Sequence, residues 1–292
     1  MRNILSITLL TICLNGHCQS VSIANDECGT ILPSNYLQWR NGIISTQNLV
    51  SNLKHDTCLN KKFSIAFHVV LDSNYQWGAV SPADLSTCII TLNNAFKRIC
   101  VSFENCFVDE IPNYTYNSWE MTATEALVLP SWNVENTINI YLVDSILGFP
   151  AGYAGSVIVI EKPFIGGSVT IHEMGHFFGL PHTWAEIGTN PVSPAPSNSQ
   201  VGSNEWVRRV QSNCKNHGDG FCDTEADCYP AGFDKITPLP CKHVPGSTDG
   251  FGDYYVPPVD NYMTYFKCGC RFSQEQYNFM ASVILASKIY LH

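Results

Sequence analysis

The chain has 292 residues and a formal net charge of −9, which disfavours nucleic acid and anionic membrane surfaces as partners. Charged residues make up 14% of the chain, well under the usual quarter, and 45% of the residues are hydrophobic. This length suits one large domain or two smaller lobes.

The first twenty residues have the three parts of a secretory signal peptide. Arg2 supplies the positive charge, residues 4–14 form a short apolar run, and Ser20 is a small residue at a cleavage position. The run is too short to span a bilayer, and no later run approaches the necessary length. We therefore expect a secreted protein without a membrane span. A lipoprotein anchored at Cys18 is the alternative, which the bulky His17 before it disfavours.

Thirteen cysteines are many for a cytosolic protein and indicate an oxidising compartment. Two of them leave with the signal peptide, so eleven remain and at least one must be unpaired. We predict that Cys28 is the unpaired residue and that the other ten form up to five disulfides. Cys88, Cys100 and Cys106 follow one another closely, which favours local disulfides among them.

The next part of the chain predicts an alternation of strands and helices. Residues 21–60 have weak periodicity, and we interpret them as a pro-segment. Residues 62–72 alternate apolar and polar side chains and predict a strand, with His68 on its less apolar face as a satisfied or exposed histidine. Residues 81–84 read Ser-Pro-Ala-Asp, a strong helix start. Two further strands are predicted at 137–144 and 157–160.

Residues 170–184 read TIHEMGHFFGLPHTW and contain the clearest chemical signal in the chain. On a helix, His172 and His176 share one face and Glu173 lies beside them. A glycine and a proline then end the helix, so the chain can turn and bring His182 to the same metal. This pattern, H-E-x-x-H-x-x-G-x-x-H, is the zinc signature of the metzincin proteases. A helix with ordinary surface histidines is the structural alternative.

The remainder of the chain predicts a second, irregular lobe. Residues 188–204 are rich in Pro, Ser, Asn and Gly and predict a loop, and six cysteines then crowd into a segment with little regular pattern. Ser273 and Gln276 form a capping box for a final helix. We therefore predict an α/β (α+β) metzincin-like catalytic domain. Its upper lobe, 61–182, has a twisted, mostly parallel sheet and the zinc-binding helix, and its lower lobe, 183–292, is disulfide-rich and ends in a helix.

Two segments of the lower lobe carry further candidate site residues. Residues 214–227 place several acidic and hydroxyl side chains in a turn with glycines, which suits Ca²⁺, with an acidic surface turn as the alternative. Residues 261–265 read NYMTY, roughly eighty residues after the third histidine. A methionine between tyrosines is ordinary core by itself. After an extended zinc signature it is typical of the metzincin Met-turn, which forms an apolar floor beneath the metal.

These motifs occur in the order typical of the pappalysins, and residues 60–285 resemble that family of secreted metzincin endopeptidases, in the branch of ulilysin and cytophagalysin. The resemblance rests mainly on the zinc motif and NYMTY, and includes FSIAFHVV, TINIYLVD and GDGFCDTEAD. It implies a fold with one catalytic zinc ion. The implied roles are His172, His176 and His182 as zinc ligands, Glu173 as general base, Met263 as the turn methionine and Tyr265 as a catalytic helper near the metal.

The resemblance also implies a structural calcium ion and particular disulfides. The calcium ion would lie near Asp219, the Cys222 carbonyl group and Thr224. The implied disulfides join Cys214 to Cys241, and one of Cys222 or Cys228 to Cys268 or Cys270.

Two further implications concern latency and specificity. Cys28 and the glycine after it resemble the family's pro-segment motif, in which the thiolate binds zinc as a fourth ligand and keeps the zymogen latent. Some relatives that prefer arginine have an acidic residue just before the cysteine after the Met-turn. Gly269 occupies that position here, so the resemblance does not extend to a preference for basic residues.

Together these features predict a secreted zinc metalloendopeptidase, made as a zymogen latched by Cys28. It would hydrolyse protein or peptide substrates as a monomer, through zinc-activated water with Glu173 as general base. The strand at 157–160, as the edge of the sheet, would pair with the extended substrate. One alternative is a catalytically silent binding module stabilised by zinc and calcium, which would not need Glu173 or Tyr265. Another is a zinc hydrolase of a different substrate class, which the Met-turn disfavours.

Overall fold

The computed structural model of the protein describes residues 35–49, 58–119, 129–147, 150–154, 157–185, 205–208, 212–227, 235–237, 242–244, 248–249, 251–266 and 268–291. The predictions for the signal peptide at 1–20, for Cys28, for the loop at 188–204, and for Cys228 and Cys241 lie outside these residues.

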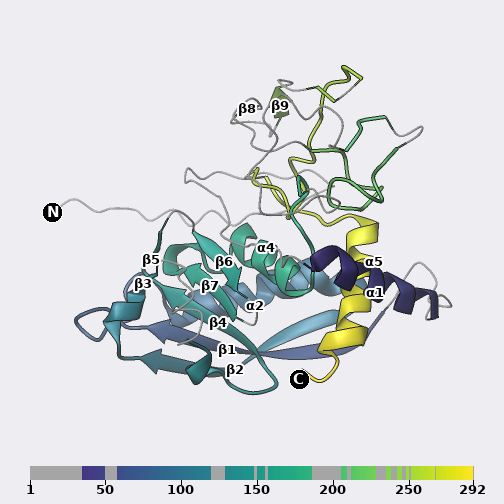
Figure 1. Ribbon diagram of the computed structural model, residues 1–292. Coiled ribbons are helices and arrows are strands. Elements are labelled where there is room, and N and C mark those ends of the chain that lie inside the picture. Colours follow the sequence, from purple (N-terminus) through teal and green to yellow (C-terminus); the bar gives the residue numbers. More distant parts are fainter. Residues whose placement is uncertain are drawn as a thin grey trace.

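A five-stranded sheet forms the body of the upper lobe, in the order β2-β1-β4-β7-β6 (Figure 1). Its first four members run parallel, and β6 pairs antiparallel with β7. The predicted strand at 157–160 is therefore an interior strand and not the edge, because β6 covers its free side. The bounds are β1 Lys61–Val70, β2 Val101–Ile111, β4 Ile138–Val143, β6 Ala151–Ala154 and β7 Val157–Glu161.

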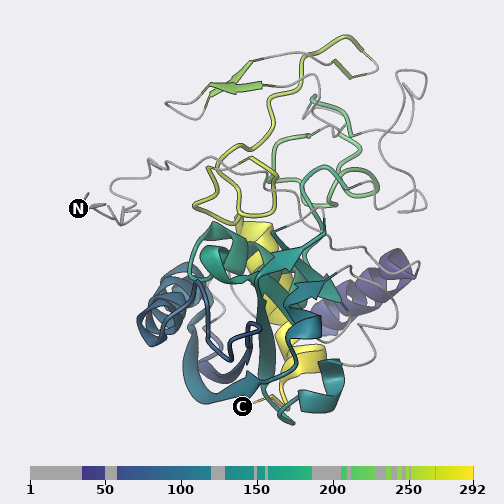
Figure 2. The same cartoon turned by 90° about the vertical axis from the view of Figure 1, so that its left-hand side faces the viewer.

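Helices and short strands complete the architecture. The helices are α1 Tyr36–Leu49, α2 Pro82–Phe96, α4 Ser168–Phe177 and α5 Gln274–Val283, and the last continues as a π-helical turn, Ile284–Lys288. Two small sheets pair β3 Ser118–Trp119 with β5 Ser145–Ile146, and β8 Lys235–Thr237 with β9 Lys242–Val244. The irregular segments between residues 205 and 266 gather beyond α4, on the side away from the sheet (Figures 1 and 2). The predicted α/β class with a mostly parallel sheet is confirmed.

The central strand β1 is buried on both faces, as expected for a strand in a parallel sheet. Phe63, Phe67 and their neighbours face the main core beneath α2, α4 and α5. The opposite face packs in a second apolar cluster that includes Tyr141 and Trp119. His68 is fully buried there, with its Nε2 2.8 Å from Asn139 Oδ1 and its ring stacked on Tyr141. Its Nδ1 lies 3.5 Å from the Asp109 carboxylate, so His68 is a buried histidine with one hydrogen-bonded ring nitrogen.

Helix α2 begins as its sequence predicts. The Ser81 hydroxyl group accepts a hydrogen bond from the Asp84 amide group, and the Asp84 carboxylate accepts one from the Ser81 amide group. The same reciprocal pair, Ser273 and Gln276, opens α5. Both capping boxes are local features, so four residues of sequence suffice to predict them. None of the described helices has the length and apolar character needed to cross a bilayer.

The upper-lobe cysteines pair differently from the prediction. Cys58 is bonded to Cys100, across a sequence separation of 42 residues. Cys88 and Cys106 are free, so the predicted local disulfides are wrong and five disulfides cannot form. The reason is geometric: Cys88 lies on the buried face of α2, whereas Cys106 lies on the exposed strand β2.

The lower-lobe pairing also needs correction. Cys214 is bonded to Cys222, with 5.2 Å between their Cα atoms, because the turn between them brings them together. The implied link from Cys214 to Cys241 is therefore wrong, and Cys222 has no sulfur left for Cys268 or Cys270. Both of these last cysteines are disulfide-bonded.

Replacing Cys58 and Cys100 together with serine should destabilise the protein, because their disulfide closes a long loop in the unfolded chain. The expected loss is about 2–4 kcal/mol in the free energy of unfolding. Chemical denaturation measures it. The matched control is Cys106→Ser, which removes an exposed free thiol. Equal stability of the double variant and the control would contradict this prediction.

Candidate metal centre

Helix α4 carries His172, Glu173 and His176, and a glycine ends it. Gly179 has φ 89°, a left-handed conformation that a side chain rarely adopts. Its amide group donates to the His176 carbonyl group, and the Leu180 amide group donates to the Gly175 carbonyl group. These two hydrogen bonds form a Schellman motif, which closes the helix and reverses the chain.

After this turn the three histidines converge. His176 Nε2 lies 3.0 Å from His172 Nε2 and 3.0 Å from His182 Nε2. All three residues are buried. Among the His, Cys, Asp and Glu side chains of the described residues, these three histidines form a group that could hold a metal ion. Their ligand atoms all lie within 4.8 Å of one another. Tetrahedral zinc with Zn–N bonds of ~2.0–2.1 Å separates its ligand nitrogens by about 3.3 Å, so the spacing suits that ion.

Backbone carbonyl groups orient two of the rings. His172 Nδ1 lies 2.6 Å from the Tyr262 oxygen, and His176 Nδ1 lies 2.7 Å from the Leu180 oxygen. A carbonyl oxygen can only accept a hydrogen bond, so each Nδ1 carries the proton. Each Nε2 then presents its lone pair to the shared space, as a metal ligand requires. These two carbonyl partners could not be predicted from the sequence.

Burial also keeps the rings neutral. It lowers the pKa of His172 to about 4, and the hydrogen bond to the Tyr262 carbonyl group opposes this shift. Burial and the neighbouring imidazoles hold the pKa values of His176 and His182 well below the ordinary histidine range. All three imidazoles are therefore uncharged at pH 7, which is the form that binds a metal ion.

Aromatic side chains hold the third histidine. Trp184 stacks on His182, with ring centroids 4.7 Å apart and an interplanar angle of 10°. Tyr265 approaches the same imidazole edge-on at 4.7 Å and also meets Trp184. Tyr265 thus lies beside the triad, near the metal ligands as the family resemblance implied. Trp184 was missed as a site residue, although it follows His182 by only two positions.

The NYMTY turn lies directly against both ends of the zinc motif. Its Met263 carbonyl group accepts a hydrogen bond from the Thr183 amide group, next to His182. The Met263 side chain is fully buried, and a Cβ atom placed on Gly175 of α4 would lie 2.5 Å from its sulfur. Asn261 secures the turn by accepting from the Met263 amide group and donating to Gln276 of α5. The turn therefore packs tightly beneath the histidine-bearing helix.

The carboxylates of the acidic turn in the lower lobe make different hydrogen bonds. Asp227 accepts a hydrogen bond from the Thr183 hydroxyl group, beside the histidines, and Asp223 accepts from Ser273 at the start of α5. Asp219 is fully buried, and its carboxylate accepts from the Thr224 hydroxyl group at 2.9 Å. Burial raises the pKa of Asp219 to about 8, and the nearby Arg40 opposes the shift. Of the three residues implied for calcium, Asp219 and Thr224 thus meet through their side chains.

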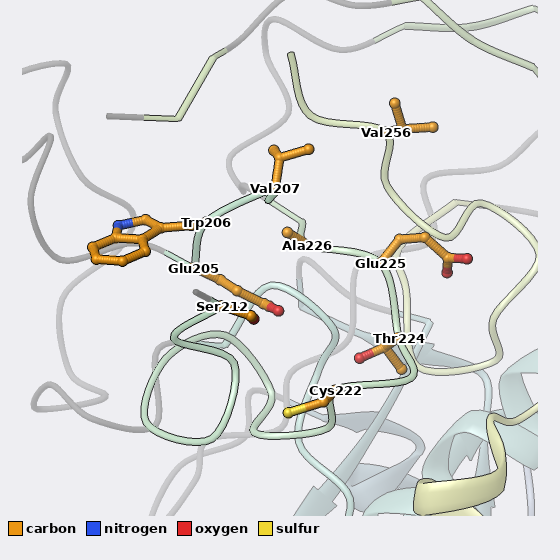
Figure 3. Close-up of a pocket in the computed structure, with 9 residues that line it drawn as sticks. All are labelled: Glu205, Trp206, Val207, Ser212, Cys222, Thr224, Glu225, Ala226 and Val256. Carbon is orange, nitrogen blue, oxygen red and sulfur yellow. The ribbon is translucent and has the colours of Figure 1, made fainter. Parts of the chain in front are cut away.

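A pocket of about 160 Å³ adjoins this turn (Figure 3). Glu205 and Ser212 direct oxygen atoms toward its middle from one side, and Thr224 does so from another. Cys222 and Thr224, two of the residues implied for calcium, belong to its lining. The full lining is Glu205, Trp206, Val207, Ser212, Cys222, Thr224, Glu225, Ala226 and Val256.

The described residues therefore define an α/β protein with a buried three-histidine centre. No protein-family model matches the chain, and no curated protein matches it. Among solved structures, a mutant of promirolysin from Tannerella forsythia is similar, with a TM-score of 0.53 and 16% sequence identity. The match covers 90% of this chain and 96% of that one. At this identity the likeness establishes the fold.

Replacing Gly175 with alanine should force Met263 aside, because the added Cβ would overlap the thioether. The expected cost is about 1–3 kcal/mol in the free energy of unfolding. Met263→Ala alone should cost about 2–5 kcal/mol. The double variant should cost less than the sum, because each change relieves the other. Chemical denaturation of all four proteins measures this coupling.

The control is Gly42→Ala on α1, where an added Cβ has no atom within 4 Å. It should not destabilise the protein. Additive effects at Gly175 and Met263, within about 0.5 kcal/mol, would show that the helix and the turn are not in contact.

Proposed function

We propose that this protein is a secreted zinc metalloendopeptidase of the pappalysin family. The observation that carries the proposal is the convergence of three buried, neutral imidazoles next to Glu173. The fold likeness to promirolysin, a pappalysin-family metzincin, supports the same class of enzyme. His172, His176 and His182 are the proposed metal ligands, on a motif whose sequence pattern and geometry agree.

Zinc fits this set of donors because three neutral nitrogen ligands leave a fourth tetrahedral position open to solvent. When bound, the ion supplies Lewis-acid chemistry that polarises a peptide carbonyl group and lowers the pKa of water toward about 7. The chain's own contribution is the rigid presentation of the three Nε2 atoms by backbone and aromatic contacts. Such orientation lowers the cost of ordering the ligands when the metal ion binds.

Glu173 is the proposed general base. It follows His172 directly on α4 and is fully buried. Its carboxylate accepts a proton from the attacking water molecule and then delivers it to the leaving amine. Tyr265, whose ring contacts His182, is the proposed donor of a hydrogen bond from its hydroxyl group to the oxyanion. One such donor contributes about 3–4 kcal/mol to stabilising the transition state.

The edge strand β6 is the proposed binding site for the substrate backbone. It lies beside α4, and Tyr153 of β6 meets Phe177 of α4 edge-on. An extended peptide can add to this strand and come close to the histidines. This assignment replaces the strand at 157–160, which the structure places inside the sheet.

Export and latency belong to the same proposal. The disulfides are consistent with an oxidising compartment, in agreement with a signal peptide at residues 1–20. A pro-segment that begins at residue 21 would carry Cys28, whose thiolate would occupy the fourth zinc position in the precursor. The mature enzyme would then act on protein or peptide substrates as a monomer.

A structural calcium ion near the 214–227 turn is also proposed. The side chains of Asp219 and Thr224 meet, and the Cys222 carbonyl group belongs to the same turn. Oxygen ligands of this kind suit Ca²⁺. This turn is connected to the metal centre, because its Asp227 accepts a hydrogen bond from Thr183, the residue after His182.

Glu173→Gln should retain zinc and lose peptidase activity by about 10²–10⁴-fold or more, because the amide cannot accept the proton. Metal analysis and turnover of a peptide library measure the two properties. Glu104→Gln, on the exposed part of β2, is the matched control and should keep full activity. Normal turnover by the Glu173 variant would remove the mechanism.

A chelator separates the proposed enzyme from a silent binding module. Casein or a peptide library should be cleaved by the processed protein, and removal of the metal should abolish cleavage. No cleavage in either condition would favour the binding module. A metal-dependent activity on a non-peptide ester or amide, without peptide cleavage, would favour another class of zinc hydrolase.

Cys28→Ala should make the precursor active before processing, because the proposed thiolate ligand is lost. The measurement is turnover of a small peptide by the unprocessed chain, with its mass checked in parallel. Cys106→Ala removes an exposed free thiol and should leave latency intact. If the unprocessed Cys28 variant stays inactive, the thiol is not the latch.

A further inference from the structure

Helix α1 lies within the segment that weak periodicity assigned to the pro-segment, yet it is part of the core. Tyr36 is 4% exposed, Arg40 5% and Ile43 7%. These three positions follow helical spacing, and together they face α5 and the main apolar cluster. A charged residue in the middle of the buried face interrupts the apolar pattern, so the sequence alone did not show an amphipathic helix.

One end of α1 rests on the turn that ends the zinc motif's helix. The Tyr36 hydroxyl group donates to the Gly179 carbonyl group at 2.8 Å. A Cβ atom on Gly179 would lie 2.6 Å from the indole ring of Trp39, so this ring lies directly on the turn. The same turn redirects the chain toward His182. Helix α1 therefore contacts the backbone that positions the third histidine.

Arg40 connects α1 to the lower lobe. Its guanidinium group lies over the rings of Phe221 and Phe279, at 5.2 and 5.5 Å from their centroids. It also donates a hydrogen bond to the Gly220 carbonyl group at 2.7 Å. A buried guanidinium group with two aromatic faces and a backbone acceptor is a fixed contact and not a loose surface one. Arg40 thereby holds the turn that begins at Asp219.

A boundary at residue 60 conflicts with the backbone around it. The Leu59 amide group donates to the Ile99 carbonyl group, and the Lys61 amide group donates to the Cys100 carbonyl group. A protease needs an accessible, extended segment, which this paired backbone does not offer. A cut after residue 60 would also leave Cys58 covalently attached to Cys100.

From these contacts we propose that α1 is a permanent part of the catalytic domain, and that the segment removed with Cys28 ends before Tyr36. Tyr36 and Arg40 are then positioning residues, which act on the metal centre through the Gly179 turn and the Asp219 turn. This inference rests on the proposed function for its catalytic meaning.

The first test is the mass of the active enzyme. After self-processing of the full chain, native mass spectrometry determines where the mature chain begins and whether α1 is still attached. The expected result is a chain that begins between residues 29 and 36. An active enzyme that has lost residues 36–49 would overturn the proposal.

The second test uses variants that remove single contacts from α1. Tyr36→Phe deletes only the hydroxyl group, and Arg40→Lys keeps the charge but loses the planar contact with both rings. Both should lower zinc affinity by about 10-fold or more and reduce kcat more than they raise KM. Arg98→Ala is the control, since this exposed arginine also lies over an aromatic ring, that of Tyr277. It should leave both properties unchanged.

Zinc affinity, measured by competition with a chromogenic chelator, separates the two proposals. Reduced zinc affinity in the variants, without peptide cleavage by any form of the protein, would overturn the proposed function and support the role of α1. Lower melting temperatures with wild-type zinc affinity and kcat would mean that α1 only stabilises the fold, and would overturn its positioning role.

Discussion

The left-handed turn at Gly179 is the constraint on which the metal centre depends. A helix can present two imidazoles on one face, but a third must come from a chain that has reversed its direction. The Schellman hydrogen bonds make this reversal within three residues of His176. A side chain at Gly179 would be strained in its backbone and would collide with Trp39. Both the left-handed backbone conformation and the packing against Trp39 therefore require glycine at this position.

The segments around the triad form hydrogen bonds with one another as well as with the histidines. The Met263 turn binds His172 through the neighbouring Tyr262 carbonyl group and binds the segment after His182 through the Thr183 amide group. Asn261 fixes this turn to α5. The bond between Asn261 and Gln276 is buried and the one between His172 and Tyr262 is partly buried, so water competes little for them. The two lobes are consequently joined at the same place where the imidazoles meet.

Features encoded within a few neighbouring residues could be predicted from the sequence. The histidine spacing, the helix-ending glycine and both capping boxes are of this kind, and so are the parallel strands with their apolar runs. Partners far apart in the chain could not be predicted. The pairing of Cys58 with Cys100 depends on how β1 lies beside the end of α2. The edge position of β6 depends on a hairpin of short strands, which has a weak pattern. Helix α1 was missed because Arg40 occupies the middle of its buried face.

The two margins of the main sheet are built in opposite ways. Strand β2 forms the far margin, and its register with β1 shifts between Ile65 and Ala66, so that Cys106 is an extra residue in the ladder. Irregular pairing and exposed charges such as Glu104 are devices that prevent a foreign strand from docking. The other margin, β6, has only four residues and lies next to α4. Fibre-like association is thus opposed at the β2 edge, while the β6 edge, which lies next to α4, is the one proposed to bind the substrate backbone.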